Sequence, residues 1–445
     1  MGAPQLNHVT SRTTTPRRLG RVALVATTAL VTALLVAPSA SATTHHGCRS
    51  SHDPATVVTD WNALTQSTIA GDTTKDPREA FLYTAFVQAA EYNAVVGTSG
   101  RYQPYRFHAH APCGASAVAA AAAAAHKVLA TYSPYATATL DAALTTSLAA
   151  VPDGKSKDDG IAFGELAAQT LLDQRVGDGR NAPIFFTKTP GPGVWRPTPP
   201  TNTPMAVPWM AFVKPLLIHS GAQFGAVGKP PALSSRLYTR DFKEVKAFGS
   251  QTGSARTDDQ TATAMFFSGN AIIQYNAALR DQVAVRHLDL LEAARMFAAV
   301  TMVQADTVIA VWWAKYTYGF WRPITAINLA DTDGNPRTDV DPLWVPLLTT
   351  PPYPEYVSGY SGVTGAFTGA LSGALRTQHL DLTLISTAVP GAIRTYDCGA
   401  ALDQDVISAR VWLGIHFRFS DILGVRTGQR IADWSLDRYF QEVED

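Results

Sequence analysis

The sequence has 445 residues and a formal net charge of +0 at pH 7, because 36 lysines and arginines balance 36 aspartates and glutamates. Such a chain has no global field to recruit nucleic acid or an anionic membrane, so any cationic site must be local. Three cysteines (Cys48, Cys113 and Cys398) exclude a disulfide-dense scaffold and a cysteine-rich metal site. One disulfide with one thiol left over is expected, without a choice of pair.

The N-terminus predicts a secretory signal peptide over residues 1–42. A basic region ending at Arg21 precedes the apolar stretch 22–36, and Ala40-Ser41-Ala42 supplies a small-residue cleavage signal. The apolar stretch is shorter than the roughly 20 residues that a membrane helix needs. An uncleaved anchor is the alternative. We expect a secreted, extracellular protein with no stable membrane anchor.

Nearly every regular segment of the remaining chain is predicted to be helical, because helix formers dominate and breakers are few. The expected helices lie at residues 78–92, 115–132, 141–150, 160–174, 240–248, 257–279, 288–314, 361–375, 406–415 and 421–439. Strand signal is confined to short tracts such as 380–387. The sequence therefore predicts an all-α protein, with an N-terminal helical region at 43–250 and a second helical domain at 251–445.

Residues 187–209 interrupt the helical pattern with a proline-rich loop. The density of proline forbids helix and indicates a long ordered loop that wraps the body of the protein. Trp195 and Arg196 are candidates for the mouth of an active site. The alternative, which we favour slightly, is a packed surface strap.

Three short segments in the last third of the chain carry the groups for an oxyanion site. They hold one lysine, two arginines, a serine, a glycine and a histidine: Lys315, Arg322, Ser358, Gly359, Arg410 and His416. The cations can neutralise a phosphate-like anion through charge-assisted hydrogen bonds. The serine hydroxyl and the glycine N–H add donors, and a histidine nitrogen can bind or attack the central atom. We call these six residues the oxyanion socket.

The order and spacing of the three segments (Lys-x6-Arg-Pro, Ser-Gly and Arg-x5-His) resemble the vanadium-dependent haloperoxidase and type 2 phosphatidic acid phosphatase superfamily, and within it the bacterial haloperoxidase-related branch. The resemblance is dense over residues 306–430 and loose before them. It implies a helical bundle with the active site at the end of the C-terminal bundle. It also implies that the socket holds vanadate, or phosphate in the same place.

The resemblance assigns a role to each matching residue. His416 would be the axial vanadium ligand or the phosphoryl nucleophile. The other five residues of the socket would hold the equatorial oxygens of the bound anion. The resemblance also makes Lys315 a catalytic residue. Trp312 and Tyr353 match positions where chloroperoxidase-like members have aromatic residues beside the metal centre.

Tyr360 departs from the pattern, because it stands where the family has the histidine of Ser-Gly-His. That histidine is the family's usual acid–base residue, so Tyr360 is the candidate for its role. A phenol titrates near 10 rather than near neutrality, although nearby cations are expected to favour phenolate. Losing a general acid typically costs about 10²–10⁴-fold in rate.

A second departure concerns the carboxylate that would orient His416. The family often has an aspartate four residues after this histidine, whereas here Ser420 occupies that place and Asp421 is shifted by one. We expect Asp306 or Asp397 to substitute.

These residues predict a secreted vanadium-dependent haloperoxidase that uses hydrogen peroxide to oxidise halide, with an organic acceptor and altered activity because of Tyr360. Trp312, Trp321 and Tyr353 favour this reading over an acid phosphatase that acts on phosphate esters. Tyr360 favours a third reading, a non-redox member that binds an oxyanion. No nucleic acid partner is expected, and the sequence does not give the oligomeric state.

Overall fold

The longest helix, α10 (Leu290–Tyr318), lies at the centre of the bundle. Asp289 and Glu292 form a capping box at its start, and Gly319, with a φ of 61°, ends it. Among the described residues it is the one helix that is long and apolar enough to cross a membrane, yet 94% of that apolar window is buried inside the protein. It is therefore the core helix of the bundle, as its interrupted apolar pattern predicted.

The structure, a computed structural model, describes residues 53–443, and the predicted signal peptide lies outside the described residues. The α-helices are α1 (Thr56–Gly71), α2 (Ala80–Ser99), α3 (Ala117–Tyr132), α4 (Thr137–Ala149), α5 (Lys155–Gln174), α6 (Gly221–Gly225), α7 (Arg236–Phe248), α8 (Asp258–Phe266), α9 (Ala271–Arg286), α10, α11 (Pro323–Asn328), α12 (Gly359–Leu375), α13 (Gly399–Trp412) and α14 (Arg418–Leu436). Short 3₁₀ helices lie at η1 (Pro77–Glu79), η2 (Pro134–Ala136), η3 (Pro208–Phe212) and η4 (Ala330–Thr332).

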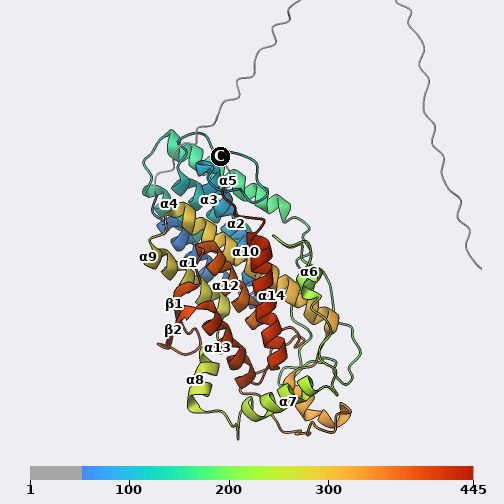
Figure 1. Cartoon of the computed structure of the whole chain (residues 1–445). Coiled ribbons are helices and arrows are strands. Elements are labelled where there is room, and N and C mark those ends of the chain that lie inside the picture. The colour runs from blue at the N-terminus through green and yellow to red at the C-terminus, as the bar shows by residue number, and fades with distance from the viewer. Residues whose placement is uncertain (1–52, 444–445) are drawn as a thin grey trace, which may run out of the picture. The chain divides into compact units, whose positions relative to one another are not determined.

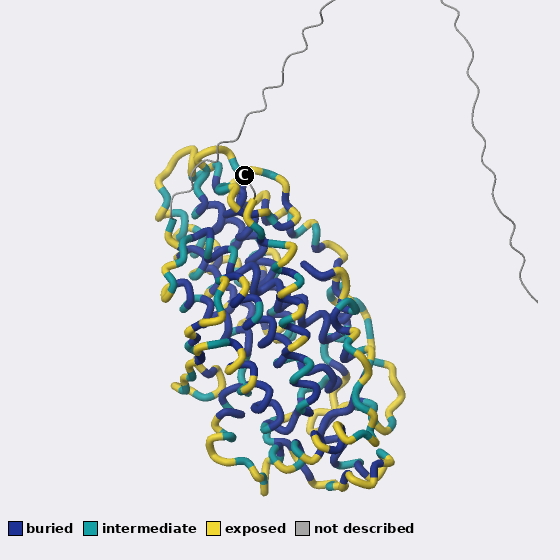
Figure 2. Tube along the Cα trace, viewed as in Figure 1, coloured by how far each residue is buried: buried dark blue, intermediate teal, exposed yellow. Residues whose placement is uncertain are grey.

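The described strands form one antiparallel hairpin, β1 (His379–Ile385) with β2 (Ile393–Cys398). The prediction of an all-α fold is confirmed. Helix α10 packs against α2 on one side and against α12 on another, and α12 packs against α14 (Figure 1). Buried residues run continuously through these helices, and exposed residues gather on the outer loops and helix faces (Figure 2).

Two predictions about local structure are wrong. The helix expected at 257–279 is broken into α8 and α9, because Asn270 caps α9 and Gly269 lies against the hairpin turn. A Cβ at Gly269 would come within 2.1 Å of the Thr387 hydroxyl, so this bend accommodates the close approach. The sequence also predicts that Arg410 and His416 share a helix, whereas His416 lies in the loop between α13 and α14.

Cys113 is disulfide-bonded, and Cys398, at the end of β2, is a half-buried free thiol. Cys398 is therefore the thiol left over from the single disulfide that the cysteine count predicted.

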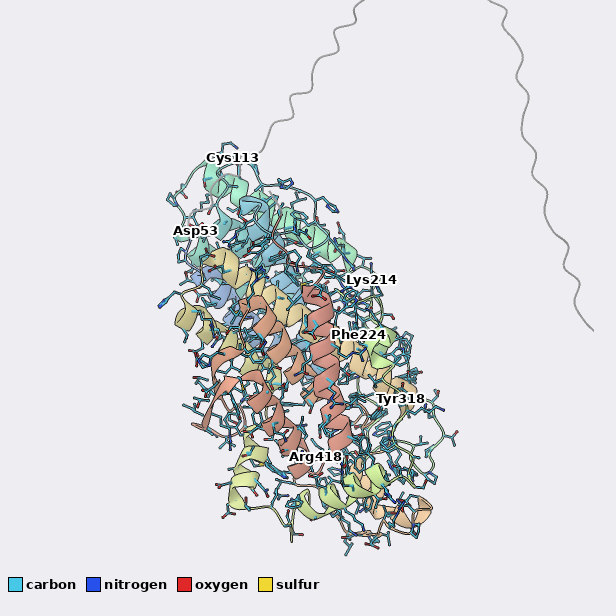
Figure 3. The ribbon with its side chains drawn as sticks, viewed as in Figure 1. Asp53, Cys113, Lys214, Phe224, Tyr318 and Arg418 are labelled. Carbon is cyan, nitrogen blue, oxygen red and sulfur yellow. The ribbon has the colours of Figure 1, made fainter. Side chains whose placement is uncertain are left out.

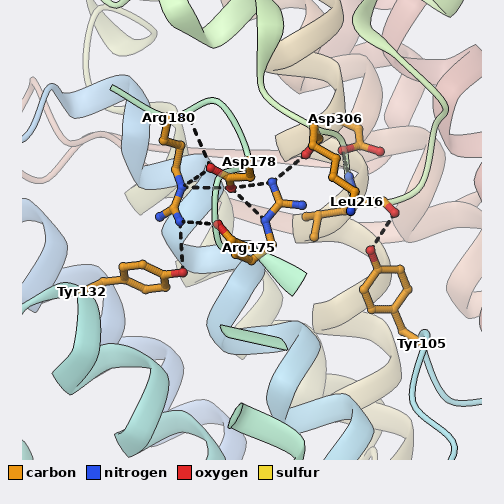
Figure 4. A network of polar contacts seen from close by, with 8 residues as sticks. Tyr105, Tyr132, Arg175, Asp178, Arg180, Leu216 and Asp306 are labelled. Carbon is orange, nitrogen blue, oxygen red and sulfur yellow. Dashed lines mark hydrogen bonds and ion pairs between the residues drawn. The ribbon is translucent and has the colours of Figure 1, made fainter. Parts of the chain in front are cut away.

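Asp306, on α10, anchors the loop that follows η3. Its carboxylate accepts hydrogen bonds from the backbone N–H groups of Leu216, Leu217 and Ile218 at 2.7, 2.6 and 2.8 Å. Arg175 lies nearby and pairs with Asp178 at 2.6 Å (Figure 4). Asp306 therefore stabilises the loop after η3 and does not bind His416, so the prediction that it orients the histidine is wrong.

Helices α12 and α14 pack at very short range through glycines. A Cβ at Gly365 would lie 2.2 Å from the carbonyl oxygen of Val425, and one at Gly428 would lie 2.2 Å from that of Gly362. No side chain fits at either position. This contact fixes the start of α12, which carries Ser358 and Gly359, against the start of α14.

Gly428→Ala should lower the free energy of unfolding by about 1–3 kcal/mol, because the added methyl group forces the two helices apart. Urea unfolding of the purified variant measures the change. Gly191→Ala is the matched control, since a Cβ there meets no atom within 4 Å, and its effect should stay within about 0.5 kcal/mol. A Gly428→Ala variant as stable as the control would contradict the close packing.

Candidate functional site

The ends of four helices meet at one end of the bundle. Lys315 lies in the last turn of α10, Ser358 caps the start of α12, and Arg410 lies in the last turn of α13. Arg322 caps α11, and His416 occupies the loop that leads into α14. Antiparallel packing of α10 and α12 explains why segments about a hundred residues apart in the chain converge here.

The structure brings all six residues of the oxyanion socket into one buried region. The Nη1 atom of Arg322 lies 3.3 Å from Nε2 of His416. Gly359 packs beside Lys315, since a Cβ at Gly359 would lie 3.9 Å from the Cε atom of the lysine. Arg410 is close enough to lower the pKa of Lys315 through its charge.

Glu355 orients His416. Its Oε1 atom lies 2.8 Å from Nδ1 of His416 and accepts a second hydrogen bond from the backbone N–H of Phe417 at 3.1 Å. Because Oε1 acts as an acceptor, we assign the imidazole proton to Nδ1, which leaves Nε2 unprotonated, with its lone pair 3.3 Å from Nη1 of Arg322. The prediction of Asp306 or Asp397 in this role is wrong. Asp397 is exposed on β2.

His416 is held neutral. Burial lowers its pKa well below the usual value, and the charges of Arg322, Lys315 and Arg410 lower it further. Burial also raises the pKa of Glu355 to about 8, against the opposing charges of Lys315 and Arg322. A neutral imidazole with an unprotonated Nε2 is the form that can coordinate a metal or attack phosphorus.

The three cations of the socket are almost completely buried, and several of their donors bind backbone carbonyls. The Nζ atom of Lys315 donates to the carbonyls of Pro354 and Glu355, both at 2.9 Å. Arg322 donates to the carbonyl of Ile415, and Arg410 donates to that of Phe267. The carbonyls fix the direction of each side chain and leave the net charge uncompensated.

Two donors of the socket lack a protein partner. Nη2 of Arg322 and Nε of Arg410 are buried and make no hydrogen bond. Burying such groups costs free energy unless an acceptor binds them. Burial, followed by the charge of Arg322, also lowers the pKa of Lys315 well below its usual value. A multivalent oxyanion would satisfy the free donors and relieve the repulsion among the cations.

Asp421 holds the start of α12. It accepts a hydrogen bond from Ser361 at 2.8 Å, and Ser358 lies 3.2 Å from Ser361. Burial raises the pKa of Asp421 to about 7, while hydrogen bonds from the two serines oppose that rise. Asp421 therefore sets the position of Ser358 and does not contact His416.

Tyr360 lies under Arg410. The guanidinium of Arg410 is 4.5 Å from the centre of the Tyr360 ring, and the hydroxyl is 3.4 Å from Oε1 of Gln274. Burial raises the pKa of Tyr360 to about 12, and the charge of Arg410 only partly offsets this. The expectation that nearby cations favour a phenolate at this position is therefore wrong.

A cavity of about 440 Å³ lies beside the socket, and we call it the mouth cavity. Its lining includes Gly359, Arg410 and Tyr360 from the predicted site, together with Trp312 and Tyr353. The Trp312 and Tyr353 rings lie 5.0 Å apart. Both aromatic residues therefore occupy the wall that the sequence predicted for them.

Arg78, from the N-terminal part of the chain, also lines the mouth cavity. Its guanidinium lies 4.9 Å from the centre of the Tyr353 ring, and it pairs with Asp76. Sequence reasoning placed Arg78 at the start of a helix and gave it no role. It lies on η1, more than two hundred residues before the motifs, so their spacing gave no signal for it.

The proline-rich loop packs as a strap. Trp195 is buried against Phe186 at 5.3 Å, and its backbone N–H donates to the carbonyl of Gly319. Neither Trp195 nor Arg196 lines the mouth cavity. The loop contacts the cavity wall at Ala206, whose carbonyl accepts from the indole N–H of Trp312 at 3.3 Å.

Arg418 lies two residues beyond His416 but outside the socket, at the start of α14 (Figure 3). It pairs with Glu244 on α7 at 2.7 Å. The ion pair links α14 to α7.

Comparison with known proteins gives relatives for the helical bundle. The family described as the VCPO second helical-bundle domain matches residues 295–445. Vanadium chloroperoxidase of Curvularia inaequalis is 28% identical over a match that covers 34% of this chain and 33% of the relative. The chain thus matches about a third of that relative's length.

Two solved structures resemble the whole described fold. The first bacterial vanadium-dependent iodoperoxidase has a TM-score of 0.73 at 22% identity, with 88% of this chain and 97% of that chain covered. An apo-type bacterial vanadium-dependent chloroperoxidase has a TM-score of 0.66 at 17% identity, with coverages of 81% and 93%. At these identities the likeness shows the fold, and the chemistry must be argued from the socket itself.

Proposed function

We propose that this chain, whose residues 295–445 match the VCPO second helical-bundle domain, is an exported vanadium-dependent haloperoxidase that uses hydrogen peroxide to oxidise halide. The observation that carries the proposal is the meeting of three buried cations with a neutral histidine whose unprotonated Nε2 faces Nη1 of Arg322. The relatives are vanadium-dependent by name, which supports vanadate as the cofactor.

The residues of the socket fit vanadate. The unpartnered Nη2 of Arg322 and Nε of Arg410 are donors for its oxygens, with Lys315, Ser358 and the Gly359 N–H as further donors. His416 Nε2 is the candidate ligand. The start of α12 adds its dipole and its free N–H groups beside this set.

Bound vanadate would supply the redox chemistry with peroxide and halide. The protein would neutralise the charge of the oxyanion, and Glu355 would keep the His416 proton on Nδ1. Trp312 and Tyr353 would limit the access of water from one side, because their rings pack together in the cavity wall.

Titration of the purified apoprotein with vanadate, followed by a halide- and peroxide-dependent halogenation assay, tests the proposal. We expect saturable binding of one vanadate and halogenation that requires all three components. An acid phosphatase on the same scaffold would instead hydrolyse a phosphate ester and be inhibited by vanadate. Vanadate binding with neither activity would leave the non-redox reading, and the absence of vanadate binding would overturn the proposal.

Tyr360→His should raise the halogenation rate while it changes vanadate affinity only modestly. An imidazole titrates near neutrality, whereas the buried Tyr360 phenol has a pKa of about 12 and holds its proton. The cations of the socket and His416 dominate the binding of the oxyanion. Rates and affinities of both proteins across pH measure the effect. An equal or lower rate in the histidine variant would contradict the hypothesis that Tyr360 lowers the halogenation rate of this protein.

A further inference from the structure

Two phenols line the mouth cavity, and their surroundings differ sharply. Around Tyr353 four cations gather from three separate segments of the chain. The guanidinium carbons of Arg78 and Arg322 lie 4.9 and 4.7 Å from the centre of its ring, and the Nζ atom of Lys315 lies at 5.0 Å. Arg410 acts on it through its charge.

Tyr360, the other phenol, lies in a more apolar setting. One cation, Arg410, faces its ring, and its hydroxyl contacts the neutral Gln274. The rings of Phe267 and Tyr275 lie 6.5 Å from that of Tyr360. Nothing in these contacts stabilises a negative charge on Tyr360 as strongly as the four cations around Tyr353 do.

We propose that Tyr353, and not Tyr360, is the acid–base residue of this site, and that Arg78 is the positioning residue that stabilises its phenolate. The inference rests on the proposed function and adds a proton carrier to it. It accounts for a site that has lost the histidine of Ser-Gly-His and yet keeps the rest of the socket.

The proposed reaction consumes one proton, since halide, hydrogen peroxide and a proton give hypohalous acid and water. Two electrons pass from halide to peroxide, and the O–O bond of peroxide breaks. The hydroxyl of Tyr353 supplies the proton and becomes a phenolate next to Arg78. A water molecule in the mouth cavity then returns a proton to the phenolate, so Tyr353 is unchanged over a turnover.

The electrostatics of the two phenols support this division of roles. Burial raises the pKa of Tyr353, but the charges of Arg78, Arg322 and Arg410 outweigh burial and leave it below its ordinary value. No acidic residue lines the mouth cavity, although Asp76 pairs with Arg78 and two further acids, Glu79 and Glu355, lie within two residues of Arg78 and Tyr353 in the chain. A general acid works best when its pKa approaches the working pH.

Ultraviolet absorbance of tyrosinate, recorded against pH in the vanadate-free protein, tests the assignment without any turnover. We expect one phenol to ionise before the others. This first transition should be lost in Tyr353→Phe and kept in Tyr360→Phe, the matched removal of the other hydroxyl. Arg78→Gln should move it to higher pH, and Arg78→Lys should restore most of the shift. A first transition that survives in Tyr353→Phe would overturn the proposal.

Measurement of the halogenation rate is the second test of the proposal. Tyr353→Phe should lower the halogenation rate about 10²–10⁴-fold while it changes vanadate affinity less than about threefold, and Tyr360→Phe should lose less of the rate. Equal losses in the two variants would overturn the proposal. If the unmodified protein binds vanadate but does not halogenate, the proposed function fails, and the absorbance titration alone then decides whether Tyr353 is the titrating phenol.

Discussion

Glu355→Gln should lower the affinity of the protein for vanadate about 10–100-fold. Glu355 would not contact vanadate itself but would act by orienting His416. The carboxylate accepts the Nδ1 proton at 2.8 Å and so leaves Nε2 free. An amide can instead turn its N–H toward Nδ1, which favours the tautomer with the proton on Nε2. Calorimetric titration with vanadate at constant pH measures the loss.

Two further variants serve as references for the affinity of Glu355→Gln. His416→Ala removes the proposed ligand itself and should bind vanadate more weakly than Glu355→Gln. Asp403→Asn is the matched control, because Asp403 is a buried carboxylate that binds Thr368 and Gln429 outside the socket. Vanadate affinity equal to that of the unmodified protein in a stably folded Glu355→Gln variant would refute the orienting role of Glu355.

Asp306→Ala should lower the free energy of unfolding by about 3–5 kcal/mol, the range found when one partner of a buried charged contact is removed. Three backbone N–H groups, those of Leu216, Leu217 and Ile218, would lose their acceptor inside the protein. The nearby Arg175 would also lose a favourable charge. Urea unfolding followed by circular dichroism measures the change.

Asp306→Asn keeps one acceptor oxygen and should cost less than Asp306→Ala. Asp153→Ala is the surface control, because the Asp153 side chain is 97% exposed. Its effect should stay within about 0.5 kcal/mol. If Asp306→Ala unfolds at the same urea concentration as this control, the carboxylate does not anchor the loop.

The helical character of the fold and the six socket residues could be predicted from sequence, because local helix propensity and motif spacing are both properties of short segments. The break between α8 and α9 could not. Its cause is the approach of Gly269 to Thr387, more than a hundred residues away. Propensity alone treats Ser268-Gly269-Asn270 as a tolerable weak point within one helix.

The orienting carboxylate was missed for a similar reason. Sequence reasoning looked for an aspartate at a fixed offset after His416, whereas a hydrogen bond requires only proximity in space. Glu355 precedes His416 by 61 residues and lies three residues before Ser358 of the Ser-Gly motif. Arg78 lies further still from the motifs, so only the packing of η1 against the Tyr353 segment reveals it.

The origin of the mouth cavity wall has a consequence for how this protein could diversify. The six charged and polar groups of the socket come from residues 315–416, whereas Pro77, Arg78 and Phe81 of the wall come from the N-terminal part. The machinery for the anion and part of the surface that meets an organic molecule are thus encoded in separate stretches of the gene. Directed evolution confined to codons 77 and 81, which spares Arg78, could alter which molecules enter and leave the anion chemistry inherited intact.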